Sequence, residues 1–113
     1  MIVQRIGSKM VIVTGSILAK AETFEELRRL SLAHTQRSRA EPGCVHHAAH
    51  IDAENGLRLV FVERWTDRAA LLTHFAEPNA RAFVAQARKL AAEPPTISIY
   101  TGDEISFAKF IGT

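Results

Sequence analysis

The chain has 113 residues, of which 47% are hydrophobic and 23% charged, and its formal net charge is +2. This length and composition predict a single globular domain over residues 1–113 that buries its own core. Basic residues are interleaved with acidic ones and no apolar run is long enough to cross a membrane, so we expect neither a nucleic-acid-binding protein nor a membrane protein.

The N-terminal residues share some features with a secretory signal, because Arg5 and Lys9 precede an apolar run at 10–19. The residues at 14–16 interrupt this run, and cleavage after it would remove the first predicted strand. We therefore expect no cleaved signal. The lone Cys44 excludes an internal disulfide and is typical of a reducing compartment, so we expect a cytoplasmic protein.

Hydrophobic patterns and turn signals divide the chain into short elements. Residues 1–9 are expected to be irregular or to add a strand. A capping box at Thr23–Glu26 starts the first helix, and the Asn55-Gly56 pair predicts a hairpin. The predicted elements are a strand at 11–20, a helix at 23–39, strands at 44–51 and 57–65, a helix capped by Thr66 or Asp67 and running through Phe75, a helix at 78–92, and strands at 96–101 and 104–110.

This order of elements predicts the fold class. It reads β-α-β-β-α-β, with the second helix split and a C-terminal strand appended at 104–110. The pattern is typical of a ferredoxin-like α+β fold. We expect its core over about residues 10–101, with the appended strand outside that core.

Alternation along the third strand puts large apolar residues on both faces of the predicted sheet. Phe61 and Trp65 share one face, and Val60 and Val62 share the other. A sheet that is covered on one side only usually has a polar opposite face. The second apolar face therefore predicts a homodimer built sheet against sheet, with the strand at 104–110 also reaching the partner subunit.

The segment after the third strand carries the most informative motif. Glu63-Arg64-Trp65-Thr66-Asp67 ends the strand, and His74 lies about two turns into the next helix, so that Trp65 and His74 can reach one pocket. Further short motifs occur along the chain in this order: Glu41-Pro42-Gly43-Cys44, Ala70-Leu71, Pro78-Asn79, Phe83 and Ile97-Ser98-Ile99-Tyr100. With these motifs the chain resembles the antibiotic biosynthesis monooxygenase family of dimeric α+β barrel proteins. The resemblance covers about residues 10–101.

The resemblance implies an enzyme, a monooxygenase that needs no cofactor and acts on a small electron-rich aromatic such as a quinol, an anthrone or a polyketide-like compound. In this reading His74 is the catalytic residue, as a base or a hydrogen-bond donor. Two alternatives stay open. The protein could bind or degrade haem with His74 as the iron ligand, or it could be a non-catalytic dimer that binds a small metabolite.

The resemblance also implies the substrate-binding residues. Trp65 and Phe61 share the inward face and are expected to contact the substrate together with Phe83, with Trp65 as a stacking wall. Relatives that degrade haem or oxidise polyketides carry an asparagine on the first strand. Thr14 and Ser16 offer hydroxyl groups there instead. The alternative, that Trp65 is simply the largest core residue at a strand end, is favoured over the substrate wall, because the resemblance implies that this tryptophan marks the fold in members of differing activity.

A run of histidines suggests a metal site, but its spacing argues against one. His46 and His50 share a strand face about 13 Å apart, and His47 points to the other face. Metal–nitrogen bonds of about 2 Å need nitrogens much closer together. We therefore predict no metal site in this run. One of these histidines, or His34 on the first helix, can still enter the pocket near His74.

Overall fold

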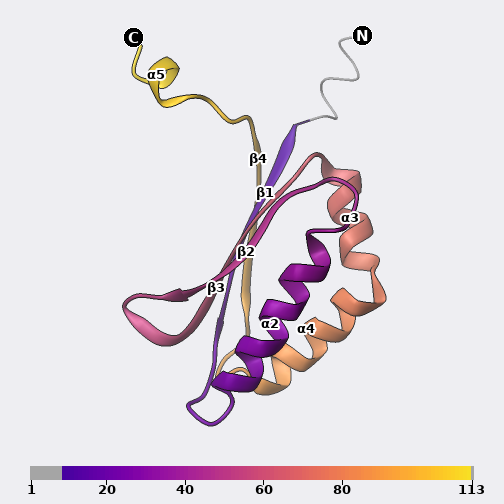
Figure 1. The fold of residues 1–113 in the computed structure, drawn as a ribbon, viewed down its shortest axis with the longest axis vertical. Helices are drawn as coiled ribbons and strands as arrows, with labels where there is room; N and C mark the ends of the chain where they lie inside the picture. The colour runs from indigo at the N-terminus through magenta and orange to yellow at the C-terminus, as the bar shows by residue number, and fades with distance from the viewer. Residues whose placement is uncertain (1–8, 113) are drawn as a thin grey trace.

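A computed structural model describes residues 9–112, so the predicted irregular start or extra strand at 1–9 lies almost entirely outside the described residues. The described part of the chain forms four strands and four helices (Figure 1). They are β1 (Met10–Leu18), α2 (Phe24–Ser38), β2 (Cys44–Asp52), β3 (Asn55–Trp65), α3 (Arg68–Ala76), α4 (Pro78–Leu90), β4 (Thr96–Gly102) and α5 (Phe107–Phe110).

The strands form one antiparallel sheet in the order β2-β3-β1-β4. Helices α2, α3 and α4 all lie on the same face of this sheet, and the other face is left open (Figure 1). This arrangement confirms the predicted ferredoxin-like α+β fold with a split second helix. The register places Glu63 opposite Val13 on β1 and opposite His47 on β2, so these three side chains share the face that the helices cover.

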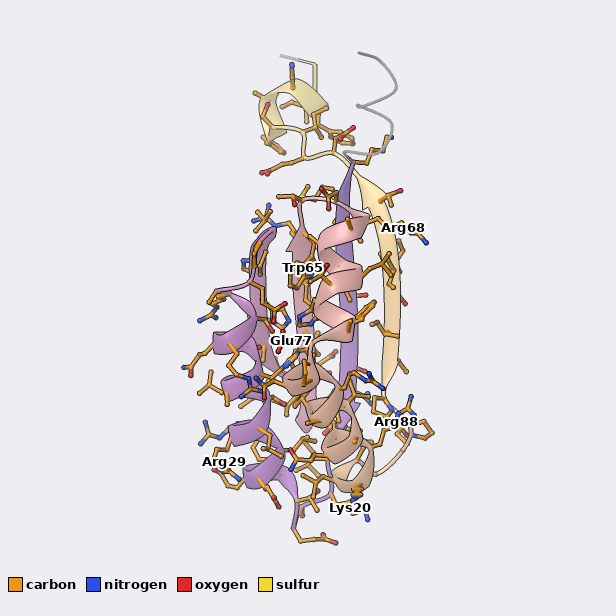
Figure 2. All side chains as sticks on the ribbon, turned by 90° about the vertical axis from the view of Figure 1, so that its right-hand side faces the viewer. Lys20, Arg29, Trp65, Arg68, Glu77 and Arg88 are labelled. Carbon is orange, nitrogen blue, oxygen red and sulfur yellow. The ribbon has the colours of Figure 1, made fainter. Side chains whose placement is uncertain are left out.

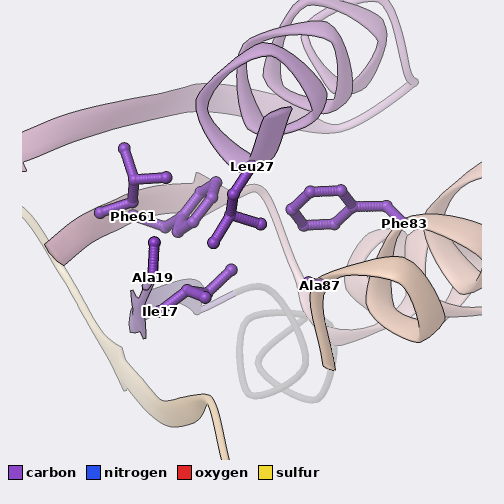
Figure 3. Packing of buried hydrophobic residues seen from close by; sticks show 7 residues of the cluster. Ile17, Ala19, Leu27, Phe61, Phe83 and Ala87 are labelled. Carbon is purple, nitrogen blue, oxygen red and sulfur yellow. The ribbon is translucent and has the colours of Figure 1, made fainter. Parts of the chain in front are cut away.

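The core between the sheet and the helices consists of two clusters of buried apolar side chains. The larger one joins β1, β3, α2 and α4 (Figure 3) and consists of Ile17, Ala19, Leu27, Leu59, Phe61, Phe83 and Ala87. The smaller one joins β1, β3 and α3 and consists of Val11, Val13, Trp65 and Leu71. Each large side chain buried in this way contributes roughly 1.5–3 kcal/mol to folding.

The helix starts show which local sequence signals act as predicted. Asp67 caps α3, since its carboxylate accepts a hydrogen bond from the backbone N–H of Ala70 at 2.9 Å. The predicted capping box at Thr23 is wrong. The Thr23 hydroxyl donates to the carbonyl of Leu90 at 2.7 Å and accepts from the N–H of Lys20 at 3.0 Å, so it joins the start of α2 to the end of α4.

The predicted C-terminal strand at 104–110 is also wrong, because residues 107–110 form the short helix α5. Ser106 caps this turn by accepting from the N–H of Lys109 at 3.2 Å. The segment runs away from the sheet (Figure 1) and leaves Phe107 78% and Phe110 73% exposed. None of the strands within residues 9–112 pairs with this segment. Local helix-forming signals therefore prevail over the alternating apolar pattern.

Among the described helices, none combines the length and apolar character needed to cross a membrane.

Candidate functional site

A cavity of about 520 Å³ lies between α3 and α4 on one side and β1, β3 and β4 on the other. Most of its lining is apolar, and the aromatic rings of Phe61 and Phe83 are part of its wall. The polar side chains of His34, Glu63 and His74 are also part of its lining. A concave, mostly apolar site with a few convergent polar groups is typical of small-molecule binding.

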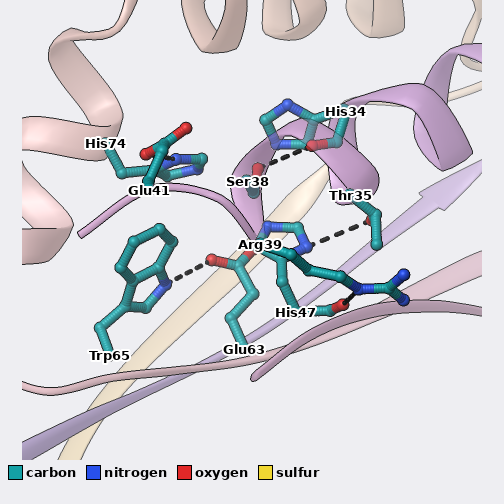
Figure 4. A network of polar contacts seen from close by, with 9 residues as sticks. All are labelled: His34, Thr35, Ser38, Arg39, Glu41, His47, Glu63, Trp65 and His74. Carbon is teal, nitrogen blue, oxygen red and sulfur yellow. Dashed lines mark hydrogen bonds and ion pairs between the residues drawn. The ribbon is translucent and has the colours of Figure 1, made fainter. Parts of the chain in front are cut away.

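Three buried histidines converge beside this cavity from three different elements (Figure 4). His34 comes from α2, His47 from β2 and His74 from α3. The ring centroids are 5.3 Å apart for His34 and His47, 5.3 Å for His34 and His74, and 5.7 Å for His47 and His74. A cluster of titratable groups in a buried setting is a candidate site on physical grounds.

His74 is held by a carboxylate. Its Nδ1 lies 2.9 Å from Oε1 of Glu41, which follows α2 in the turn to β2 (Figure 4). An ionised carboxylate only accepts hydrogen bonds, so Nδ1 carries the hydrogen and Nε2 of the neutral ring keeps a free lone pair. Gly43 shapes this turn with φ +84°, and an added Cβ there would lie 2.5 Å from the Cβ of Ala70 on α3.

Glu63 is a buried carboxylate between His47 and Trp65. It accepts a hydrogen bond from the indole Nε1 of Trp65 at 2.9 Å, and its Oε2 lies 3.3 Å from Nε2 of His47. Burial by itself raises the pKa of Glu63. The imidazole of His47, the indole N–H and the nearby His74 together outweigh burial and hold this pKa below its usual value.

His34 packs against an aromatic side chain. Its ring stacks on Phe83 with a centroid distance of 4.3 Å and an interplanar angle of 6°. Burial, followed by repulsion from His47 and His74, lowers the pKa of His34 to about 3. His34 is therefore neutral at physiological pH.

The low pKa of His34 predicts a loss of stability in mild acid. Below pH 6.5 the unfolded chain binds a proton at this residue, whereas the folded chain does not until about pH 3, so stability falls as pH decreases through this window. Between pH 7 and pH 5 the free energy of unfolding is expected to fall by about 2 kcal/mol more in the wild type than in His34→Phe. Urea unfolding in chelator-treated buffer measures this difference, and equal losses in the two proteins would contradict it.

The structure brings together some of the predicted site residues but not all of them. His74, Phe61, Phe83 and Ser16 line the cavity. Thr14 does not, because it lies exposed in register with Val62 on the open face of the sheet.

Trp65 does not line the cavity either. It is 0% exposed and lies behind His74, with a ring centroid distance of 4.6 Å. The prediction of a stacking wall is therefore corrected. Trp65 is the core residue of the alternative interpretation, and its indole N–H holds Glu63.

The histidine run on β2 is arranged as its spacing predicted, since His46 and His50 are exposed and His47 is buried under the helices. Sequence reasoning missed the pairing of Glu41 with His74 and the meeting of His47 with Glu63. In the sequence, Glu41 stood out only as part of the Glu41-Pro42-Gly43-Cys44 motif. Cross-strand register was the signal for the second contact, because it sets His47 directly opposite Glu63.

Comparisons with known proteins place this chain in a family. The sequence model of the antibiotic biosynthesis monooxygenase family matches residues 10–86. An uncharacterised protein of Synechocystis, sll1783, is 37% identical over 90 residues, which are 80% of this chain and 61% of that protein. The chain thus spans about three-fifths of the length of that relative.

Solved structures agree with this match. Rv0793 from Mycobacterium tuberculosis superposes with a TM-score of 0.80 at 30% identity, covering 86% of this chain and 99% of that one. A "putative antibiotic biosynthesis monooxygenase" from Deinococcus radiodurans gives a TM-score of 0.81 at 27% identity, covering 85% and 95%. The chain therefore belongs to the antibiotic biosynthesis monooxygenase family.

Proposed function

We propose that this protein is a cofactor-independent monooxygenase that acts on a small electron-rich aromatic, such as a quinol or an anthrone, in the cavity beside His74. The observation that carries the proposal is the Glu41–His74 pair at the wall of a mostly apolar cavity. A histidine oriented by a carboxylate is a suitable general base near neutral pH. The family membership and the name of the Deinococcus relative support an oxygenase.

The proposed reaction begins with proton transfer to His74. Glu41 accepts the Nδ1 hydrogen, so Nε2 is free to take a proton from the substrate. The resulting phenolate or carbanion is electron-rich enough to transfer electrons to oxygen. For an anthrone, a CH₂ group becomes C=O with one oxygen atom of O₂, and the other oxygen leaves as water with the two hydrogens. The apolar walls keep bulk water away from the reactive anion.

Oxygen uptake by the purified protein tests this proposal. The panel consists of quinols, anthrones and related phenols, each corrected for autoxidation without protein. We expect uptake above that background for at least one compound. Uptake at background level across the panel would contradict the proposal. Saturable binding of the same compounds without uptake would instead support a non-catalytic metabolite-binding protein.

Two arginines predict that the substrate is acidic. Arg81 and Arg88 on α4 line the cavity, and neither guanidinium group has an ion pair among the described residues. Arg88 lies on α4 near the beginning of β4 (Figure 2). Their charges favour an anionic substrate, either a phenolate or a ring that carries a carboxylate.

Removing both charges by Arg81→Gln and Arg88→Gln is expected to raise KM about tenfold for an acidic substrate and to leave kcat nearly unchanged, because the lost interaction is made equally in the ground and transition states. Steady-state oxygen uptake measures both parameters. Arg68→Gln is the matched control, since Arg68 is exposed at the far end of the helical layer (Figure 2). An unchanged KM in the double variant would contradict an anionic substrate.

We also propose that the protein is a homodimer that packs through the open face of its sheet. Val62 is half-buried on this face, in register with Thr14, and the neighbouring row contains Ile12 and Tyr100. Light scattering after gel filtration is expected to give twice the mass of one chain for the wild type. Val62→Glu is expected to give the mass of one chain with an unchanged circular dichroism spectrum. A monomeric wild type would overturn the proposal.

A further inference from the structure

We propose that His34, His47 and His74 bind a divalent first-row transition-metal ion, with the carboxylate of Glu63 as the fourth ligand. One ring nitrogen from each histidine can be chosen so that all three lie within 4.8 Å of one another. All three histidines are buried, and Oε2 of Glu63 lies 3.3 Å from Nε2 of His47. The inference does not depend on the proposed function.

Hydrogen bonds to neighbouring side chains fix two of the three rings. Nδ1 of His74 is held by Glu41 at 2.9 Å, and Nδ1 of His47 is held by the hydroxyl of Thr35 at 3.2 Å (Figure 4). Each contact uses Nδ1 and leaves Nε2 of the same ring available to a metal ion. This is how metal-binding histidines are usually fixed, with the second nitrogen bonded to a carboxylate, a hydroxyl or a carbonyl.

An independent observation comes from the hydrogen-bond inventory of the described residues. Nε2 of His47 is buried and makes no hydrogen bond, and its nearest charged neighbour is Oε2 of Glu63 at 3.3 Å. Buried polar atoms in folded proteins are almost always paired. A metal ion bound by this nitrogen and by Glu63 would satisfy both groups at once.

The ligand set and its surroundings suit particular metals. Three imidazoles and a carboxylate are ligands that Zn²⁺, Co²⁺, Ni²⁺ and Fe²⁺ accept, whereas Ca²⁺ and Mg²⁺ prefer oxygen only. Tetrahedral bonds of about 2.0–2.1 Å need nitrogens about 3.4 Å apart, so small side-chain rotations would close the site. His34, Glu63 and His74 line the cavity, which gives the ion access to the site.

Metal binding would change what His74 can do. A metal bound at Nε2 occupies the same lone pair that the proposed base needs, so ligation and proton transfer at this atom exclude each other. Metal binding is therefore measured without substrate, and its outcome is separate from that of the oxygen-uptake experiment.

The test is titration of the tag-free 113-residue protein with Co²⁺ after removal of metals by EDTA. Visible absorption and calorimetry are expected to show one Co²⁺ per chain, with the intense ligand-field bands of a low-coordinate site. His34→Phe keeps the stacking on Phe83 and removes one ligand, so its affinity should fall by more than about 100-fold.

Two further variants keep the test decisive. Thr35→Val preserves the shape of the buried side chain and removes only the outer hydrogen bond to His47, so it should weaken binding about 10- to 100-fold even if His34→Phe fails to fold. A variant with His46→Gln and His50→Gln, both exposed, should bind like the wild type. The proposal is overturned if the folded wild type binds no stoichiometric Co²⁺, or if only the His46 and His50 changes abolish binding.

Discussion

Replacing His74 with asparagine is expected to lower kcat about 10²- to 10⁴-fold, the usual contribution of a general base. The asparagine amide nitrogen lies close to where Nδ1 was, so it can still donate to Glu41, but nothing replaces the lone pair of Nε2. The His74→Asn variant therefore removes the base but keeps the hydrogen bond that joins α3 to the turn after α2. Steady-state oxygen uptake on the best substrate of the panel measures the change.

The matched control is His50→Asn, the same substitution at an exposed histidine on the opposite face of the sheet. Its kcat should equal that of the wild type. Glu41→Gln adds a second check, because a neutral amide holds the His74 ring less firmly and stabilises its protonated form less. We expect it to lower kcat less than His74→Asn does. Full activity in His74→Asn would show that the base lies elsewhere.

The second large effect concerns stability. Trp65→Ala is expected to lower the free energy of unfolding by about 3–5 kcal/mol, because it removes the largest side chain of a fully buried cluster. Folded domains of this size are stable by only about 5–15 kcal/mol. The change therefore brings the protein close to unfolding at ambient temperature. Chemical denaturation followed by circular dichroism measures it.

A milder pair of variants distinguishes a core tryptophan from a substrate wall. Trp65→Phe retains most of the packing but leaves Glu63 without the indole hydrogen bond, so we expect a loss of about 1–3 kcal/mol with no change in KM. Phe75→Ala is the counterpart, since Phe75 lines the cavity and is 40% exposed. It should raise KM with little loss of stability. A raised KM in Trp65→Phe would restore the stacking role.

The fold followed from local patterns in the sequence, because strand alternation and turn residues report which face a side chain takes. The inward side of β3, with Phe61, Glu63 and Trp65, was predicted correctly for this reason. The strand at 104–110 was not, since an alternating pattern does not say whether a neighbouring strand is present to pair with.

The site was predicted less completely than the fold. His74 was identified from its place in the motif, but its neighbours depend on contacts between distant segments. His34 and His47 meet it only once α2 packs on β2 and the strand register is fixed. Trp65 was misplaced because a strand-end position is compatible with either a cavity wall or a core, and only the packing of α3 decides between them.

Strand β4 has a consequence for how the isolated chain behaves in solution. It lies at the edge of the sheet, and its apolar residues Ile97, Ile99 and Tyr100 are each more than half exposed. An edge with free backbone groups and such side chains is a template for adding strands from other molecules, which leads to aggregation. Pro94 and Pro95, which precede β4, have no N–H to donate and limit how far such pairing extends. A concentrated sample of the protein should therefore remain free of aggregates only while another surface covers strand β4.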